Sequence, residues 1–104
     1  MNSQFKKGIL EVCVLAKIFN KDMYGYEIVS ALSENIDVTG GTVYTILRRL
    51  TKDEFLESYL VESIEGPARR YYRITQKGSN ELFSSIGQWK MFSRAVDKIF
   101  KEVF

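Results

Sequence analysis

Two segments of the chain concentrate basic and hydroxyl side chains that can bind phosphate oxygens and the edges of bases. Residues 39–52 and 66–77 contain no acidic residue and hold seven basic ones, Arg48, Arg49, Lys52, Arg69, Arg70, Arg73 and Lys77. The formal net charge of the whole chain is only +2. A local basic patch on a nearly neutral protein is the charge distribution that contact with a DNA backbone requires.

The first basic segment is predicted to form a helix with one apolar and one polar face. Its apolar residues recur at helical spacing, at Val43, Ile46, Leu47 and Leu50. The opposite face carries hydroxyls and cations without an acid, namely Thr42, Tyr44, Thr45, Arg48, Arg49 and Lys52. Such a face fits the major groove of DNA. It is equally typical of an ordinary amphipathic helix with a solvated basic face, and the helix alone does not decide between the two.

The second basic segment is predicted to belong to a hairpin with strands over residues 55–62 and 69–75 and a turn at Gly66-Pro67. Alternation separates an inward set from an outward set of residues, Tyr72 and Ile74 against Arg69, Tyr71 and Arg73. The arginines either contact DNA or only discourage pairing with other strands. The neighbouring basic helix favours contact with DNA.

Two further helices are predicted before the basic helix, over residues 5–19 and 23–33. Asp22 is the expected N-cap of the second, and the tyrosines of its first turn, Tyr24 and Tyr26, either pack there or bind a phosphate through their hydroxyls. The first helix is apolar on nearly all sides. It therefore needs a second covering surface, which a partner subunit would supply.

A long final helix is predicted from a Thr75 cap to about Glu102. Its apolar residues follow a heptad-like seam, Leu82, Ile86, Trp89, Phe92, Val96, Ile99 and Val103. A single helix with such a seam usually pairs with a second copy, and we therefore expect a two-fold dimer.

The residue types exclude much chemistry. The chain has no histidine and one cysteine, so a zinc site or a Ser-His or Cys-His pair cannot be assembled from its own residues. Cys13 lies among apolar residues and is expected to be a buried, reduced thiol. No segment looks like a signal peptide or a membrane span, and we expect a cytoplasmic protein without cofactor or metal. A small enzyme remains an alternative for which no catalytic residues can be named.

Three motifs follow one another along the chain: YGYEI at residues 24–28, GTVYTILRRL at residues 41–50 and GPARRYYRIT at residues 66–75, with Gly78 after them. Together they resemble the PadR family of bacterial transcriptional regulators. The short length and single C-terminal helix are similar to the compact subfamily that includes multidrug-responsive repressors. The resemblance implies a mainly α fold with a small β-hairpin, in which residues 1–75 form a winged helix-turn-helix and residues 76–104 a dimerisation helix.

The resemblance also implies a homodimeric repressor on a palindromic operator in double-stranded DNA, with the third helix in the major groove and the wing along the backbone. By position, the DNA contacts would be Thr42, Tyr44, Thr45, Arg48, Arg49, Arg69, Arg70, Tyr24, Lys6 and Lys7. Trp89, with Phe92 nearby, matches the position where drug-binding members hold a flat hydrophobic effector, although its other role is dimer packing. The alternative is a protein-interaction module without specific DNA binding.

Overall fold

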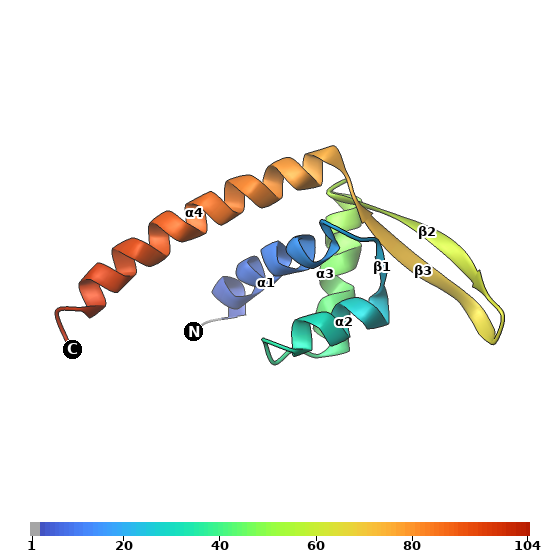
Figure 1. The fold of residues 1–104 in the computed structure, drawn as a ribbon, viewed down its shortest axis with the longest axis horizontal. Coiled ribbons are helices and arrows are strands. Elements are labelled where there is room, and N and C mark those ends of the chain that lie inside the picture. Colours follow the sequence, from blue (N-terminus) through green and yellow to red (C-terminus); the bar gives the residue numbers. More distant parts are fainter. Residues whose placement is uncertain (1–2) are drawn as a thin grey trace.

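The computed structural model describes the backbone of residues 3–104 and the side chains of residues 8–104. Within this range, four helices accompany one antiparallel sheet of three strands (Figure 1). The elements in chain order are α1 (Ser3–Ile18), β1 (Met23–Tyr24), α2 (Gly25–Ser33), α3 (Gly40–Lys52), β2 (Leu56–Ser63), β3 (Gly66–Ile74) and α4 (Gln76–Phe100). The arrangement is a winged helix with a long C-terminal helix, as the sequence predicted.

Helix α3 forms for the reasons expected from its sequence. The Thr39 side chain caps it by accepting a hydrogen bond of 3.2 Å from the backbone N–H of Thr42. The predicted apolar stripe is buried along its whole length, at Val43, Ile46, Leu47 and Leu50. The opposite, polar face is therefore turned away from the core.

The start of α2 differs from the prediction. Its N-cap is Tyr24, whose backbone N–H donates to Oε1 of Glu27 over 3.2 Å. The assignment of Asp22 as the cap was wrong because Met23 and Tyr24 pair with β3 as the short strand β1, which moves the helix start along the chain. Asp22 instead accepts a hydrogen bond of 2.5 Å from the hydroxyl of Tyr59.

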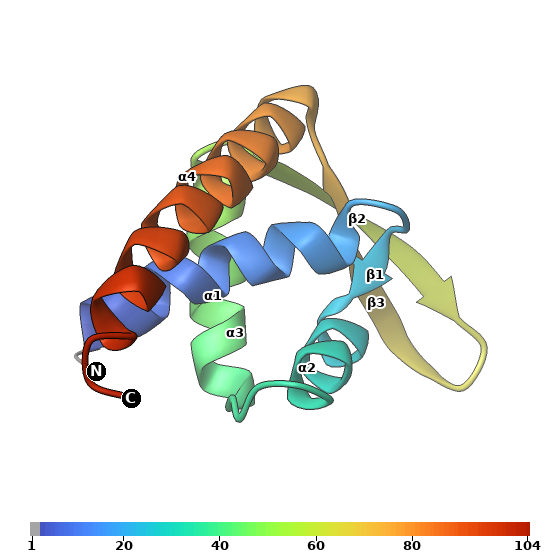
Figure 2. The same ribbon diagram turned by 60° about the vertical axis from the view of Figure 1, so that its left-hand side comes forward.

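The sheet has the order β1-β3-β2, and β2 and β3 extend beyond the helices as a hairpin, the wing (Figures 1 and 2). The turn lies at Ile64 and Glu65, so the predicted turn at Gly66-Pro67 was wrong. Both residues already belong to β3. Pro67 is tolerated there because the pairing is irregular between Val61 and Ser63 on the opposite strand, where a missing N–H interrupts no regular ladder.

One hydrophobic core joins the first three helices to the inner face of the sheet and to the start of α4. Its buried members are Leu10, Val14, Leu15, Ile18, Ile28, Leu32, Val43, Ile46, Leu47, Leu50, Leu56, Tyr72 and Leu82. Gly78 makes the junction with α4 possible, because a Cβ at this position would collide with the carbonyl oxygen of Phe55. The wing and α3 are thus fixed to the same core.

Helix α4 begins at its predicted cap, where the Thr75 side chain accepts a hydrogen bond of 3.0 Å from the backbone N–H of Gly78. It packs beside α1 through its first turns and then projects outwards (Figure 1). Two members of the predicted seam, Leu82 and Ile86, pack on the core of their own chain. The helix ends at Phe100, so Val103 follows it in a turn instead of continuing the seam.

Candidate nucleic-acid interface

The polar face of α3 is open to solvent and unopposed by acids at its centre. Thr42, Thr45 and Arg48 are all exposed. The Thr45 hydroxyl donates to the carbonyl of Gly41 over 3.0 Å, and Arg48 donates to Thr45 Oγ1 over 3.3 Å. Arg48 forms no ion pair with any residue whose side chain is described. Its charge is therefore available to a phosphate or a base.

Arg49, although adjacent, is placed differently. Its Nη1 lies 3.1 Å from Oε1 of Glu11 on α1, whose side chain is only 20% exposed. That carboxylate oxygen is enclosed and accepts no hydrogen bond of good geometry from the described residues. The positive charge of Arg49 therefore compensates an acid on the neighbouring helix, and the two arginines of α3 are not equivalent.

The outer face of the wing carries a stack of three tyrosines and two arginines, the outer tyrosine stack, composed of Tyr24, Tyr59, Tyr71, Arg69 and Arg73. The ring centroids of Tyr59 and Tyr71 lie 5.8 Å apart, and those of Tyr24 and Tyr71 lie 5.5 Å apart. The guanidinium of Arg69 covers the Tyr24 ring at 4.6 Å, and that of Arg73 covers the Tyr59 ring at 4.8 Å. Favourable cation–π contacts thus occupy both arginines.

Asp22 closes one end of this stack. Its Oδ2 accepts from the Tyr59 hydroxyl and lies 3.4 Å from Nε of Arg73, which also lies 3.6 Å from Glu57 through Nη1. The hydrogen bond to Asp22 raises the pKa of Tyr59, because ionising the phenol would destroy the bond. The charge of Arg73 is therefore balanced within the protein.

The inner face of the wing, together with α2 and α3, borders a pocket of about 200 Å³ that is open to solvent, the inner wing pocket. It is lined by Tyr24, Gly25, Tyr26, Tyr44, Arg69, Arg70 and Tyr72. The Tyr44 ring lies directly against Gly25, where a Cβ would collide with it. Arg70 donates to Ser58 Oγ over 3.0 Å. No lining residue is acidic, so the pocket favours an anion.

The pocket gathers four of the predicted contact residues from three elements. Tyr24, Tyr44, Arg69 and Arg70 all line it, and Thr42, Thr45 and Arg48 extend the same polar surface along α3. The side chains of Lys6 and Lys7 lie outside the described residues. Sequence reasoning missed Gly25 and Tyr72 as members of the site, and it considered Tyr26 only as one of two tyrosines that either pack or bind a phosphate. Tyr72 was assigned to the core by alternation, which gives the direction of its ring but not the environment of its hydroxyl.

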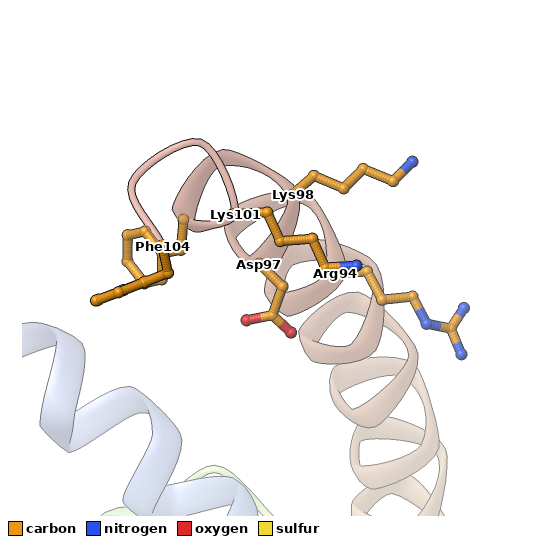
Figure 3. A pocket seen from close by; sticks show the side chains of 6 residues that line it. Arg94, Asp97, Lys98, Lys101 and Phe104 are labelled. Atoms are coloured by element: carbon orange, nitrogen blue, oxygen red, sulfur yellow. The ribbon is translucent and has the colours of Figure 1, made fainter.

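The far end of α4 carries a second, larger pocket of about 470 Å³, which is wide open. Figure 3 shows its side chains on the last turns of the helix and the following tail, with labels on Arg94, Asp97, Lys98, Lys101 and Phe104. Phe100 also lines the pocket. The predicted effector residues do not line it, and Trp89 and Phe92 are 43% and 55% exposed. Among the described residues, no three potential ligands converge on a metal site, and no helix is long and apolar enough to cross a membrane.

Cys13 is half-buried on α1 and forms no disulfide. Burial raises the pKa of its thiol, and the nearby charge of Lys17 lowers it by less. The protonated thiol is a poor nucleophile. The structural role expected for Cys13 agrees with this environment.

Comparison with known proteins gives a consistent picture. Residues 14–84 match the model of the transcriptional regulator PadR-like family. An uncharacterised protein of Lysinibacillus sphaericus is 32% identical over 101 residues, which cover 93% of each chain. The crystal structure of a PadR-like transcriptional regulator from Bacillus cereus is 37% identical, with a TM-score of 0.83 over 94% of this chain and 97% of the other.

A more distant structure, Bacillus subtilis PadR in complex with operator DNA, is 20% identical. It superposes with a TM-score of 0.70 over 75% of this chain and 46% of the other. At this identity the likeness concerns the fold alone.

Proposed function

The chain belongs to the PadR-like family of transcriptional regulators, and from this premise we propose that it is a cytoplasmic, homodimeric repressor of transcription that binds a palindromic operator. The observation that carries the proposal is the acid-free polar surface formed by α3 and the inner wing pocket. The related Bacillus subtilis fold was solved with operator DNA, which supports the same use of the fold here. The family is one of transcription regulators and not of enzymes, and we propose no catalytic residue.

In the proposed complex, the N-terminal half of α3 enters the major groove. Thr42, Tyr44 and Thr45 would meet phosphates and base edges, and Arg48 would pair with a base because its charge is not balanced by an acid. Arg69 and Arg70 would contact the backbone from the wing. Arg49 stands at the edge of this surface, where Glu11 competes for its charge.

The second copy would pair through α4. Beyond its first turns this helix exposes a row of large apolar side chains, including Trp89, Phe92 and Ile99 at 43%, 55% and 61%. A monomer rarely leaves so much apolar surface open along one helix, and two-fold pairing would cover it. Half-sites on the operator would then lie about one helical turn apart.

Trp89 and Phe92 would also provide the aromatic walls of a site for a flat hydrophobic effector at this dimer contact. Binding there would release the repressor from DNA by changing the spacing of the two recognition helices. Tryptophan fluorescence and melting temperature measured across a panel of planar aromatic and cationic compounds test this part. Unchanged signals for the whole panel would leave α4 with dimerisation alone.

Arg48→Ala is the variant that tests base reading by α3. If Arg48 pairs with guanine, the change should weaken binding to the operator by about 1–3 kcal/mol and binding to random duplex by much less. Lys21→Ala, which removes an exposed positive charge before β1, is the matched control. Both duplexes are titrated at two salt concentrations, with the region upstream of the gene itself as the first operator candidate.

A protein-interaction module without specific DNA binding is the competing function, supported by the exposed apolar residues of α4. Salt separates the two functions, because release of phosphate counterions makes DNA affinity fall steeply between low and moderate salt, whereas an apolar interface barely responds. Salt-insensitive association, or equal affinity for every duplex, would favour the competing function.

A further inference from the structure

Tyr72 is only 7% exposed, but its hydroxyl is not among the fully enclosed polar atoms and forms no hydrogen bond with any described group. The core holds the Tyr72 ring, so its accessible hydroxyl is a donor fixed in one position before any ligand arrives. Tyr72 lines the inner wing pocket, so the missing partner would enter from this pocket. A fixed, accessible donor in the lining of a pocket suits a ligand that accepts hydrogen bonds.

The charges around this hydroxyl specify the kind of acceptor. Arg70 and Arg48 both act electrostatically on Tyr72, and the third neighbour, Tyr44, offers another hydroxyl. Arg69 and Arg70 line the pocket from the wing, and none of the lining residues is an acid. Tyrosine hydroxyls and guanidinium groups together match an oxyanion that accepts several hydrogen bonds and carries negative charge.

We propose that the inner wing pocket binds a single backbone phosphate of the DNA, with the Tyr72 hydroxyl and the Arg70 guanidinium as its principal donors. This inference rests on the proposed function and adds to it a defined phosphate subsite. The pocket lies at the junction of α2, α3 and the wing, beside the exposed face of α3. It therefore fixes the angle at which α3 enters the groove without reading sequence.

Tyr72→Phe removes only the hydroxyl and keeps the buried ring. We expect a loss of about tenfold or more in affinity for DNA, similar for operator and random duplex, because a hydrogen bond to a charged group is lost. The melting temperature should stay nearly the same, since the hydroxyl makes no hydrogen bond within the described part of the protein and the ring remains in the core. Tyr71→Phe is the matched control, with the same chemistry on the adjacent residue and the opposite face, and it should leave affinity unchanged.

A methylphosphonate scan of the operator locates the phosphate. In the wild-type protein, one position per half-site should weaken binding when its phosphate is neutralised. In Tyr72→Phe or Arg70→Ala, neutralising that phosphate should weaken binding by less than a further twofold, because the protein partner of the phosphate is already lost. Arg70→Ala should in addition lower the salt slope by about two, one for each half-site, and Tyr72→Phe should leave the slope unchanged.

The outcomes separate failure of this subsite from failure of the proposed function. Wild-type protein that binds no duplex in a salt-dependent manner overturns the function itself. Wild-type protein that binds its operator while Tyr72→Phe binds equally well overturns the subsite alone. A rise in melting temperature with inorganic phosphate at constant ionic strength, present in wild type and absent in Tyr72→Phe, together with an unchanged scan, would assign the pocket to a free phosphate and overturn the backbone contact.

Discussion

The two faces of the wing carry similar residues, but these residues contact other protein groups on the outer face and are largely uncompensated on the inner face. The outer face has tyrosines and arginines that stack on one another, and Asp22 and Glu57 balance the charge of Arg73. The inner face has Arg70 and Tyr72 on the alternate positions of the same strand, with no acid in the lining of the pocket and an accessible Tyr72 hydroxyl that forms no hydrogen bond with a described group. The difference is one of partners and not of residue type.

This difference separates groups that hold the fold from groups that remain available to a ligand. On the outer face, Arg73 is held by the Tyr59 ring and by two carboxylates, so a phosphate would have to displace existing charge partners. Arg69 covers the Tyr24 ring but has no carboxylate partner among the described residues, and it also lines the inner wing pocket. On the inner face, the Ser58 hydroxyl is the side-chain partner of Arg70. A neutral hydroxyl leaves the charge of Arg70 uncompensated. A basic residue in a wing therefore indicates DNA contact only where no acid of the protein already balances its charge.

The largest effect that distinguishes the two faces should come from removing whole rings. Tyr72→Ala leaves a cavity in the core and should lower the free energy of unfolding by about 3–4 kcal/mol. Tyr71→Ala, on the half-buried outer face, should cost about 1 kcal/mol. Urea denaturation at one fixed protein concentration measures both, because dimer formation would make stability depend on concentration. Equal losses would mean that the two faces do not differ in packing.

The next effect concerns Asp22, which closes the outer tyrosine stack. Asp22→Asn should lower stability by about 1 kcal/mol, at the low end for hydrogen bonds to a charged group because the side chain is 36% exposed. DNA affinity should stay within about twofold of wild type at low temperature. Glu57→Gln is the matched control, since its exposed contact with Arg73 should contribute no more than about 0.5 kcal/mol. If Asp22→Asn lost more DNA affinity than Tyr72→Phe, the outer face and not the inner face would be the one that contacts DNA.

A smaller effect should follow from crowding the inner face at the start of α2. Gly25→Ala places a methyl group so close to the Tyr44 ring that the ring must move. The ring can rotate outward because it is exposed. DNA affinity should fall several-fold, by less than about 1 kcal/mol, with little change in stability. Gly40→Ala is the matched control, because its Cβ would meet the same ring at 3.8 Å, an ordinary contact distance. Equal DNA affinity in both variants would remove Tyr44 from the interface.

The sequence predicted the helices and the direction of the β3 side chains because these depend on periodicity. Val43, Ile46, Leu47 and Leu50 bury the stripe expected of them, and Tyr72 lies inside. The prediction failed where a tertiary contact overrides a local preference. Asp22 is a good cap in isolation, but pairing of Met23 with β3 makes it a partner of Tyr59 instead. A strand of two residues carries no periodic signal.

The candidate site was predicted in part for the same reason. Periodicity placed Tyr44 and Arg48 on the exposed face of α3, and both are exposed in the structure. It could not distinguish Arg48 from Arg49, because the ion pair to Glu11 depends on how α1 crosses α3. Nor could it identify the surroundings of the Tyr72 hydroxyl, since Tyr44 on α3 meets Arg70 and Tyr72 on β3 only through the tertiary fold.

The smallest effect is a dependence of stability on alkaline pH through Tyr59. Its pKa is raised above the ordinary value of 10.0, chiefly by the hydrogen bond to Asp22, so the folded protein favours the protonated phenol. This contribution is fully present below pH 10 and is lost as pH rises through the higher pKa of the folded state. The melting temperature of wild type should therefore exceed that of Tyr59→Phe at pH 8, and the difference should shrink above pH 10. Burial also raises the pKa of Tyr72, so ionisation of Tyr72 lowers stability at alkaline pH as well. The variant Tyr72→Phe lacks this contribution and so separates it from that of Tyr59. A difference between wild type and Tyr59→Phe that stays constant from pH 8 to 11 would show that the Tyr59–Asp22 bond does not stabilise the outer face, and the contrast between the two faces would then rest on the arginines alone.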